Sequence, residues 1–235
     1  MTYVIIGNGV ASIGAIEGIR RLDQEGTIVV LGSEHVPAYG RPLISYLLAG
    51  KIGPERLNLR SEDFYRRMCV DLRLNTTATG IDAKKKTVTT NKGEVIPYDR
   101  LLLATGGVPF NPPIPGSEGP DIYNFTNLDH AQALIAASKK LKRAVVIGGG
   151  LIGLKAAESL FDRGVDVTIL ELSSRVLSAA FDENAGRLAA RRLAETGIGV
   201  RCGVTAKEIH RDDKGHVMGV LTTDGMFVPC EAVIV

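Results

Sequence analysis

Two glycine-rich turns constrain this chain more than any other feature of its sequence. The first lies in YVIIGNGVASIG and contains Gly7 and Gly9, and the second lies in AVVIGGGLIGLKAAE and contains Gly148, Gly150 and Gly153. Each follows an apolar, β-branched run and precedes a helical pattern, which predicts a strand, a tight turn and a helix. The glycines let a pyrophosphate approach the backbone, and the helix begins with unpaired N–H groups and the positive end of its dipole. Two copies predict that one polypeptide binds two nucleotide cofactors.

Length, charge and cysteine usage limit the function classes. A chain of 235 residues with 45% hydrophobic content fits one large domain or two of ordinary size. The 28 basic and 26 acidic residues give a net charge of +2, and no basic run exceeds residues 84–86, so we do not expect a nucleic-acid partner. Cys69, Cys202 and Cys230 form no C-x-x-C pair, which favours a reducing compartment and predicts no metal site. We expect neither a signal peptide nor a membrane span. The protein is therefore expected to be cytoplasmic.

The strand after the second turn indicates how that site selects its nucleotide. VDVTILE ends at Glu171, where a carboxylate is able to accept both ribose hydroxyls of an adenosine. This residue favours NADH over NADPH, although Arg175 offers a nearby partner for a 2′-phosphate. The alternative is that Glu171 is an ordinary exposed acid at the end of a strand.

The first turn departs from the same pattern at two places. The strand TIVVL is followed by Ser33 and Glu34, so the ribose-binding acid is shifted by one position or replaced. Ser12 stands where the second turn has its third glycine. Serine is small enough to preserve the close packing of helix on strand, so we expect a modified nucleotide site here.

The rest of the pattern predicts an α/β fold of two nucleotide-binding domains, each with a parallel sheet, helices and an antiparallel meander. Strands are expected at 3–7, 27–31, 143–147 and 165–171, and helices at about 10–22, 42–48, 128–140, 152–163 and 183–195. We interpret VDLRL, KKTVTTN and EVIPYD as a meander with a turn at 91–93. The proline-rich stretch 109–120 predicts a crossover between the domains.

Several motifs occur in an order that resembles a known family. GNGVAS, YGRPLIS, YDRLLLATGG, IPG, GGGLIGLKAAE and ILE resemble the FAD- and NAD-dependent pyridine nucleotide-disulfide oxidoreductases over essentially the whole chain. Within them the chain is most similar to the branch of NADH:rubredoxin reductases, ferredoxin reductases and the flavin part of NADH-dependent nitrite reductases. The resemblance implies two Rossmann-like domains of the glutathione reductase type, with FAD binding in 1–113 and NAD binding in 114–235.

The end of the chain adds an expectation about the first domain. EAVIV resembles the strand that leads, in this family, into a second turn and back to the FAD domain. We therefore expect the FAD domain to be incomplete at its C-terminal side, the chain to be a fragment, and the fragment alone to bind FAD weakly and to be inactive.

The resemblance also assigns residues to the two cofactors. For FAD it implies contacts with the pyrophosphate, the adenosine ribose and the flavin from Gly7, Gly9, Val10, Ala11, Ser12, Ser33 or Glu34, Arg41, Pro42, Ala104, Thr105 and Gly106. For NADH it implies contacts from Gly148, Gly150, Leu151, Ile152, Gly153 and Glu171.

One pair of positions departs from the family pattern. The rubredoxin and ferredoxin reductase branch commonly carries a lysine after the Arg-Pro-x-x-Ser turn and a glutamate two places after the third glycine of the NAD motif, and here these positions hold Tyr46 and Lys155. Our hypothesis is that Lys155 supplies the positive charge that stabilises an anionic reduced flavin, while Tyr46 fills space or forms a hydrogen bond. The alternative is that Lys155 extends from its helix into solvent.

The implied activity is hydride transfer from NADH to FAD, followed by electron transfer to an external acceptor. Residues 38–51 contain no cysteine, which disfavours a thiol-mediated half-reaction. The acceptor is then a small rubredoxin- or ferredoxin-like protein, an attached metal domain, a quinone or dioxygen. Two other functions remain open, a redox-inactive nucleotide-binding module and a peripheral membrane quinone reductase. Nothing in the pattern specifies an oligomeric state.

Overall fold

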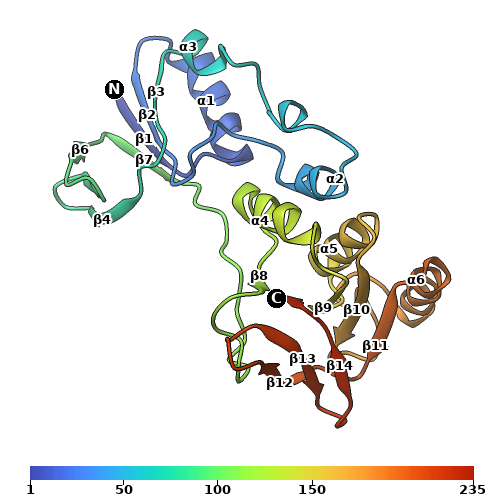
Figure 1. Ribbon diagram of the computed structural model, residues 1–235. Coiled ribbons are helices and arrows are strands. Elements are labelled where there is room, and N and C mark those ends of the chain that lie inside the picture. The colour runs from blue at the N-terminus through green and yellow to red at the C-terminus, as the bar shows by residue number, and fades with distance from the viewer. The chain divides into compact units, whose positions relative to one another are not determined.

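The computed structural model describes residues 1–235, which form two compact units (Figure 1). Unit 1 consists of Met1–Gly40 and Pro54–Gly107, and unit 2 consists of Arg41–Gly53 and Val108–Val235. Packing therefore divides the chain differently from the predicted domain boundary at residue 113, because residues 41–53 and 108–113 belong to unit 2. The assignment of one cofactor to each domain stays a prediction.

Unit 1 is built on a parallel four-stranded sheet with the strand order β3-β2-β1-β7. Its strands are β1 (Thr2–Ile6), β2 (Thr27–Leu31), β3 (Val70–Arg73) and β7 (Arg100–Leu103), and its helices are α1 (Val10–Leu22), α3 (Phe64–Arg67) and the short 3-10 helix η2 (Pro54–Arg56). A separate antiparallel sheet joins β4 (Ala78–Asp82), β5 (Thr87–Thr90) and β6 (Val95–Pro97). The bounds of α1 and β2 match the predicted helix and strand.

The core of unit 1 follows the alternation of side chains along its strands, because successive residues point to opposite faces of a sheet. One face packs against the helices through Ile5, Ile28 and Val30 of the sheet, Ile13 and Ile16 of α1, and Phe64 of α3. The other face packs against the meander through Val4, Ile6, Val29, Leu31, Val88 and Ile96. The parallel sheet is therefore the middle of three layers, and the first glycine turn lies at its carboxyl edge.

One predicted element was wrong in its pairing. VDLRL is expected in the antiparallel meander, but its strand β3 pairs in parallel with β2, with Val70 opposite Ile28 and Arg73 opposite Leu31. Alternation of apolar and polar residues fits a half-covered edge strand of either kind, so the pattern alone did not distinguish them. The meander consists of β4, β5 and β6.

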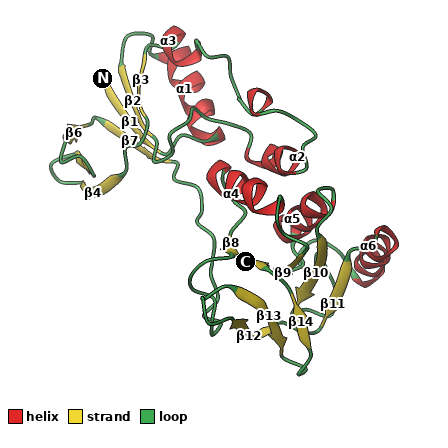
Figure 2. Cartoon of the chain, viewed as in Figure 1, coloured by secondary structure: helices red, strands yellow, loops and turns green.

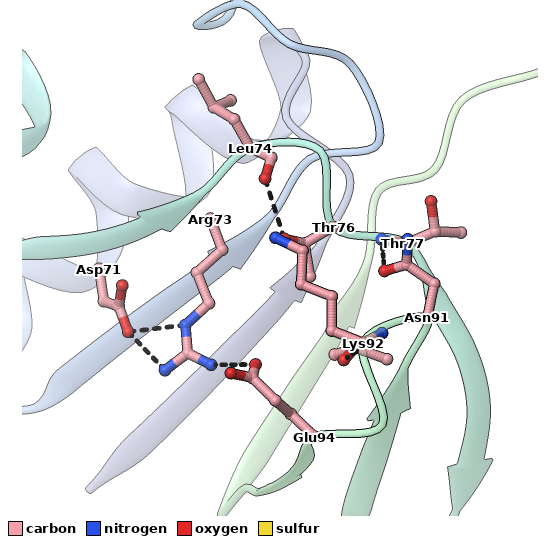
Figure 3. A network of polar contacts seen from close by, with 9 residues as sticks. Asp71, Arg73, Leu74, Thr76, Thr77, Asn91, Lys92 and Glu94 are labelled. Atoms are coloured by element: carbon pink, nitrogen blue, oxygen red, sulfur yellow. Dashed lines mark hydrogen bonds and ion pairs between the residues drawn. The ribbon is translucent and has the colours of Figure 1, made fainter.

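A polar network connects the end of β3 to the meander (Figure 3). Arg73 donates to Asp71 from Nη2 at 2.7 Å and from Nε at 2.9 Å, and its Nη1 donates to Glu94 at 2.8 Å. Lys92 Nζ donates to the hydroxyl of Thr76 at 2.9 Å, and Thr76 is almost fully buried. These bonds hold the connection between β3 and β4 against the turn between β5 and β6.

Unit 2 contains a parallel five-stranded sheet with the order β11-β10-β9-β15-β8. Its strands are β8 (Ile122–Tyr123), β9 (Arg143–Ile147), β10 (Asp166–Glu171), β11 (Gly199–Cys202) and β15 (Ala232–Ile234). Its helices are η1 (Arg41–Leu43), α2 (Ile44–Leu48), α4 (Leu128–Ser138), α5 (Leu151–Phe161) and α6 (Glu183–Thr196). An antiparallel sheet of β12 (Ala206–Arg211), β13 (Val217–Thr222) and β14 (Phe227–Pro229) completes it (Figure 2).

Two sets of contacts organise unit 2. The meander covers one face of the parallel sheet through a buried cluster of Val145, Leu170 and Val233 with Ile209, Val217, Val220 and Cys230. The short helix α2 packs against α4 and α5, so the segment 41–53 belongs to this unit. Ser159 Oγ donates to the carbonyl of Ser45 at 2.9 Å, and Lys51 forms an ion pair with Asp162 at 2.7 Å. These bonds hold the segment on α5.

None of the helices combines the length and the apolar character that crossing a membrane requires.

Candidate functional site

The second glycine turn connects β9 to α5 in unit 2. Gly148 has φ = +109°, a conformation that side chains rarely adopt. A Cβ on Gly153 would lie 2.0 Å from the carbonyl oxygen of Gly148, so only glycine allows this close packing of helix on turn. A Cβ on Gly150 would have no neighbour within 4 Å. The turn therefore has open space beside the N-terminus of α5, where a pyrophosphate fits.

Glu171 ends β10 beside this turn. Its Oε2 accepts the backbone N–H of Gly149 at 2.6 Å, and its Oε1 accepts that of Ser173 at 2.6 Å. These bonds fix the carboxylate at the carboxyl edge of the sheet, where the ribose of a dinucleotide lies in doubly wound folds. Arg175 donates to carbonyls of its own loop, including that of Phe181 at 3.0 Å. The guanidinium is thus engaged within the protein, and the carboxylate is the group presented by this edge.

A cavity of about 560 Å³ opens beside the second turn, and we call it the turn cavity. Five of its lining residues are ones that the resemblance assigned to NADH: Gly148, Gly150, Leu151, Ile152 and Gly153. The others include Pro109, Phe110, Phe125, Thr126, Ile234 and Val235, which sequence reasoning missed. No motif assigns these residues to a cofactor. The register of β15 on β9, which sets Ile234 opposite Val146, explains how the chain's last residues come to line this cavity.

A second cavity of about 420 Å³ shares Phe125, Thr126, Leu151 and Ile152 with the turn cavity. Its other lining residues are Arg41, Pro42, Ile44, Ser45, Tyr46 and Lys155, and we call it the α2–α5 cavity. It brings together Tyr46 and Lys155, which are far apart in sequence, because α2 packs on α5. Arg41 Nη1 donates to the carbonyl of Thr126 at 2.9 Å. The roles of Arg41 and Pro42 beside FAD stay predictions.

Lys155 and Tyr46 are both reachable from this cavity. Lys155 Nζ forms an ion pair with Glu158 at 2.7 Å on the same helix, and 43% of the lysine side chain is exposed. Tyr46 is also exposed. The ammonium group therefore has a nearby carboxylate that reduces its electrostatic effect, a feature that the sequence hypothesis did not include.

The first glycine turn connects β1 to α1 in unit 1. Gly7 also has φ = +109°, and a Cβ there would lie 2.0 Å from the carbonyl oxygen of Ala104, which follows β7. The hydroxyl of the buried Ser12 donates to the Gly7 carbonyl at 2.8 Å and accepts the N–H of Gly9 at 2.9 Å. Ser12 thus replaces the third glycine with a bonded side chain.

The other residues of unit 1 that are assigned to FAD lie near the carboxyl edge of the same sheet. Val10 and Ala11 are exposed at the start of α1, Thr105 and Gly106 are exposed after β7, and Ser33 is exposed after β2. Glu34 accepts a hydrogen bond from the hydroxyl of Tyr39 at 2.7 Å.

Asn8, in the middle of the first turn, was missed by the sequence analysis. Its Nδ2 is buried and has no hydrogen-bond partner within the protein. A buried amide donor ordinarily has an acceptor, and the phosphate and ribose oxygens of a dinucleotide are acceptors of that kind. The turn therefore fits such a ligand.

The cysteines lie outside both cavities. Burial raises the pKa of the Cys230 thiol to about 12 and also raises the pKa of Cys202, while Cys69 is exposed on unit 1. A raised pKa keeps a thiol protonated and therefore weakly nucleophilic at neutral pH.

Two strand, glycine-turn and helix units on parallel sheets define a protein with two dinucleotide-binding sites. The whole chain, residues 1–235, matches the pyridine nucleotide-disulphide oxidoreductase family, and the protein belongs to that family.

Three relatives show what the chain is similar to. It is 36% identical over 232 residues to a nitrite reductase [NAD(P)H] of Bacillus subtilis (strain 168), covering 98% of this chain and 29% of the relative. It is 30% identical over 237 residues to a rubredoxin-NAD(+) reductase of Alcanivorax borkumensis, covering 98% and 60%. The solved covalent complex of putidaredoxin reductase with putidaredoxin matches with a TM-score of 0.93 at 30% identity, covering 99% of this chain and 57% of that one. The chain spans less than two thirds of each relative.

These findings confirm the family named from the motifs and the α/β fold class with its parallel and antiparallel sheets. The predicted enzyme class and cofactor pair, FAD with NAD(H), agree with this family. The individual contacts assigned to each cofactor stay predictions.

Proposed function

We propose that the protein is an FAD-dependent NADH oxidoreductase that passes electrons to an external acceptor. The observation that carries the proposal is that two cavities in unit 2 share four lining residues, Phe125, Thr126, Leu151 and Ile152. One of these cavities is lined by the second glycine turn and the other by Lys155. When bound, the two cofactors supply the hydride and electron chemistry. The chain's residues bind and orient them.

At the NADH site each residue has a distinct task. The open face of Gly150 leaves room for the pyrophosphate, and the N–H groups at the start of α5 face it. Glu171, held by two backbone bonds, accepts the ribose hydroxyls and repels a 2′-phosphate. Phe110 and Phe125 line the turn cavity with apolar surface, which excludes water from a nicotinamide ring.

In the α2–α5 cavity the charge of Lys155 is the feature with electrostatic consequences. A fixed cation beside a group that gains electrons stabilises the reduced form. Glu158 opposes this effect through its ion pair, so the balance between the two side chains sets the net field. Tyr46 lines the same cavity and adds an aromatic surface.

We propose a small redox protein or an attached redox domain as the acceptor. Relatives named for rubredoxin and putidaredoxin support a small protein, and the greater length of the nitrite reductase relative supports an attached domain. Residues 38–51 contain no cysteine, and the thiol of Cys230 is buried with a raised pKa, which supports electron exit without a thiol intermediate.

The test is an anaerobic titration of the FAD-loaded full-length protein with NADH, followed by flavin absorbance, with NADPH in parallel. We expect bleaching by NADH at lower concentration than by NADPH. Addition of a rubredoxin, a [2Fe–2S] ferredoxin, a soluble quinone or dioxygen to the reduced protein then compares acceptors by the rate of reoxidation. Bound FAD that NADH does not reduce would favour a redox-inactive nucleotide-binding module instead.

A further inference from the structure

The middle residue of the first glycine turn carries a polar side chain where only the backbone was expected to act. Asn8 lies between Gly7 and Gly9, directly after β1. Its side chain reaches the end of the neighbouring strand, because a Cβ built on Gly32 after β2 would lie 3.2 Å from Asn8 Cβ and 3.8 Å from Nδ2. The amide therefore sits at the carboxyl edge of the sheet, where β1 and β2 both end.

The orientation of this amide is determined by Tyr65 of α3. Tyr65 Oη accepts the backbone N–H of Ala38 at 3.2 Å and lies 2.8 Å from Asn8 Oδ1. Because the phenol oxygen accepts from Ala38, its own hydrogen needs an acceptor, and Oδ1 is that acceptor. Rotating the amide by 180° would set its NH2 group against the phenol and leave the phenol hydrogen unpaired. The network thus keeps Oδ1 on Tyr65 and directs Nδ2 away from it.

Tyr65 is suited to this donor role. Burial raises the pKa of its phenol, so the hydroxyl keeps its proton across the physiological range. The ring packs edge to face on Phe64, with centroids 5.2 Å apart, and Phe64 is fully buried in the core between α1 and the sheet. The phenol is therefore held in place by the fold.

Nδ2 is left buried and without any partner in the protein. Leaving a buried N–H donor unpaired costs about 1–3 kcal/mol, and proteins ordinarily avoid this cost. The pair of residues that fixes the amide also maintains the unpaired donor, which is the arrangement expected of a preorganised binding group. The NH2 group only donates hydrogen bonds, so it suits an oxygen acceptor on a phosphate or a ribose.

We infer that Asn8 Nδ2 is a hydrogen-bond donor to the pyrophosphate or the adenosine ribose of FAD, and that Tyr65 is the residue that positions it. This inference rests on the proposed function, in which the first turn holds FAD. It adds a side-chain contact to a turn whose Gly9 N–H is already engaged by Ser12 at 2.9 Å. The amide donor compensates for that engaged backbone group.

The test measures the FAD affinity of the full-length protein rather than its turnover. Asn8→Asp keeps an oxygen that accepts from Tyr65 and replaces the donor by a negatively charged oxygen, so the FAD dissociation constant should rise about tenfold or more. Asn91→Asp is the matched control, because it adds the same charge in unit 1 at an exposed turn and keeps the oxygen that accepts the N–H of Thr77. We expect the control to bind FAD like the unaltered protein.

A second pair of variants separates binding from folding. Asn8→Ala removes the donor without adding charge, and Tyr65→Phe removes only the hydroxyl, so both should weaken FAD binding severalfold. If Tyr65 acts through Asn8, adding Tyr65→Phe to Asn8→Ala should produce no further loss of affinity. The midpoint of unfolding measured without FAD reports the stability of each variant alone. The increase of that midpoint when FAD is added reports FAD binding.

The outcomes distinguish the inference from the proposed function. A full-length protein that binds no FAD overturns both. If the unaltered protein binds FAD and the Asn8 variants bind it with equal affinity, only the inference is overturned. The buried donor would then be assigned to an ordered water. Additive losses for Tyr65→Phe and Asn8→Ala would contradict the positioning role of Tyr65.

Discussion

The carboxylate of Glu171 and the backbone N–H of Gly149 are joined by a 2.6 Å hydrogen bond between the ends of β10 and β9. Bonds of this kind, between a charged acceptor and an amide, are among the stronger hydrogen bonds in proteins. This one connects the acid that we assign to the ribose to the turn that we assign to the pyrophosphate. In the proposed function, the geometry of one half of the NADH site is therefore set before any nucleotide binds, which reduces the ordering required on binding.

Replacing Glu171 by Gln should weaken NADH binding about tenfold or more, because one of its two backbone N–H groups then faces an NH2 group and the negative charge is lost. Discrimination against NADPH should fall, since the 2′-phosphate no longer meets a carboxylate. Dissociation constants for both nucleotides measure the effect. Glu183→Gln, at the start of α6, removes the same charge outside both cavities and should leave both constants unchanged. Equal NADH affinity in the Glu171 variant would contradict the ribose assignment.

Replacement by alanine should have different effects at Gly150 and at Gly153 of the second turn. Gly153→Ala places a Cβ 2.0 Å from the Gly148 carbonyl, so we expect a loss of about 1–3 kcal/mol in the free energy of unfolding. Gly150→Ala meets no protein atom within 4 Å, so the fold should keep its stability while the methyl group fills the space of the pyrophosphate. Urea unfolding and NADH titration of both variants separate the two effects. A Gly150 variant with undiminished NADH affinity would place the nucleotide elsewhere.

The glycine turns were predictable because their backbone geometry depends on local residue types. Positive φ at Gly7 and Gly148 and the close approach at Gly153 are conditions that glycine meets best, so the motif predicted a structure that the chain adopts. The strand ending at Glu171 was predictable for a similar reason, since a run of apolar β-branched residues indicates a buried parallel strand.

Features that depend on distant packing were not predictable in this way. Phe125 and Val235 reach the turn cavity through the tertiary arrangement of β8 and β15, and no local pattern encodes it. The role of Asn8 depends on Tyr65, and the bond between them became visible only in the fold. The assignment of β3 failed because an alternating edge strand has the same pattern whether its neighbour runs parallel or antiparallel.

The buried thiol of Cys230 should make stability depend on alkaline pH. An unfolded cysteine ionises near pH 8.5, whereas burial holds the pKa of Cys230 at about 12. The unfolded state alone therefore loses a proton between these values, so the contribution is fully present below about pH 8.5 and is lost as pH rises toward 12. We expect a slope of about 1 kcal/mol per pH unit that Cys230→Ala removes. Urea unfolding at several pH values measures it, and identical slopes in the two proteins would contradict the assignment.

Lys155 provides the last prediction, because its charge lies in the α2–α5 cavity and is opposed by Glu158 at 2.7 Å. Lys155→Glu reverses the charge and should lower the flavin midpoint potential by about 30 mV or more, which corresponds to about 1.4 kcal/mol for two electrons. Glu158→Gln removes the opposing charge and should shift the potential upward. Lys207→Met is the control, because it removes the same charge from an exposed position on β12 that lines neither cavity. Spectroelectrochemical titration of the FAD-loaded variants measures all three. A Lys155 variant without a downward shift would indicate that this side chain only extends into solvent, and the positive field on the flavin would then have to come from another group.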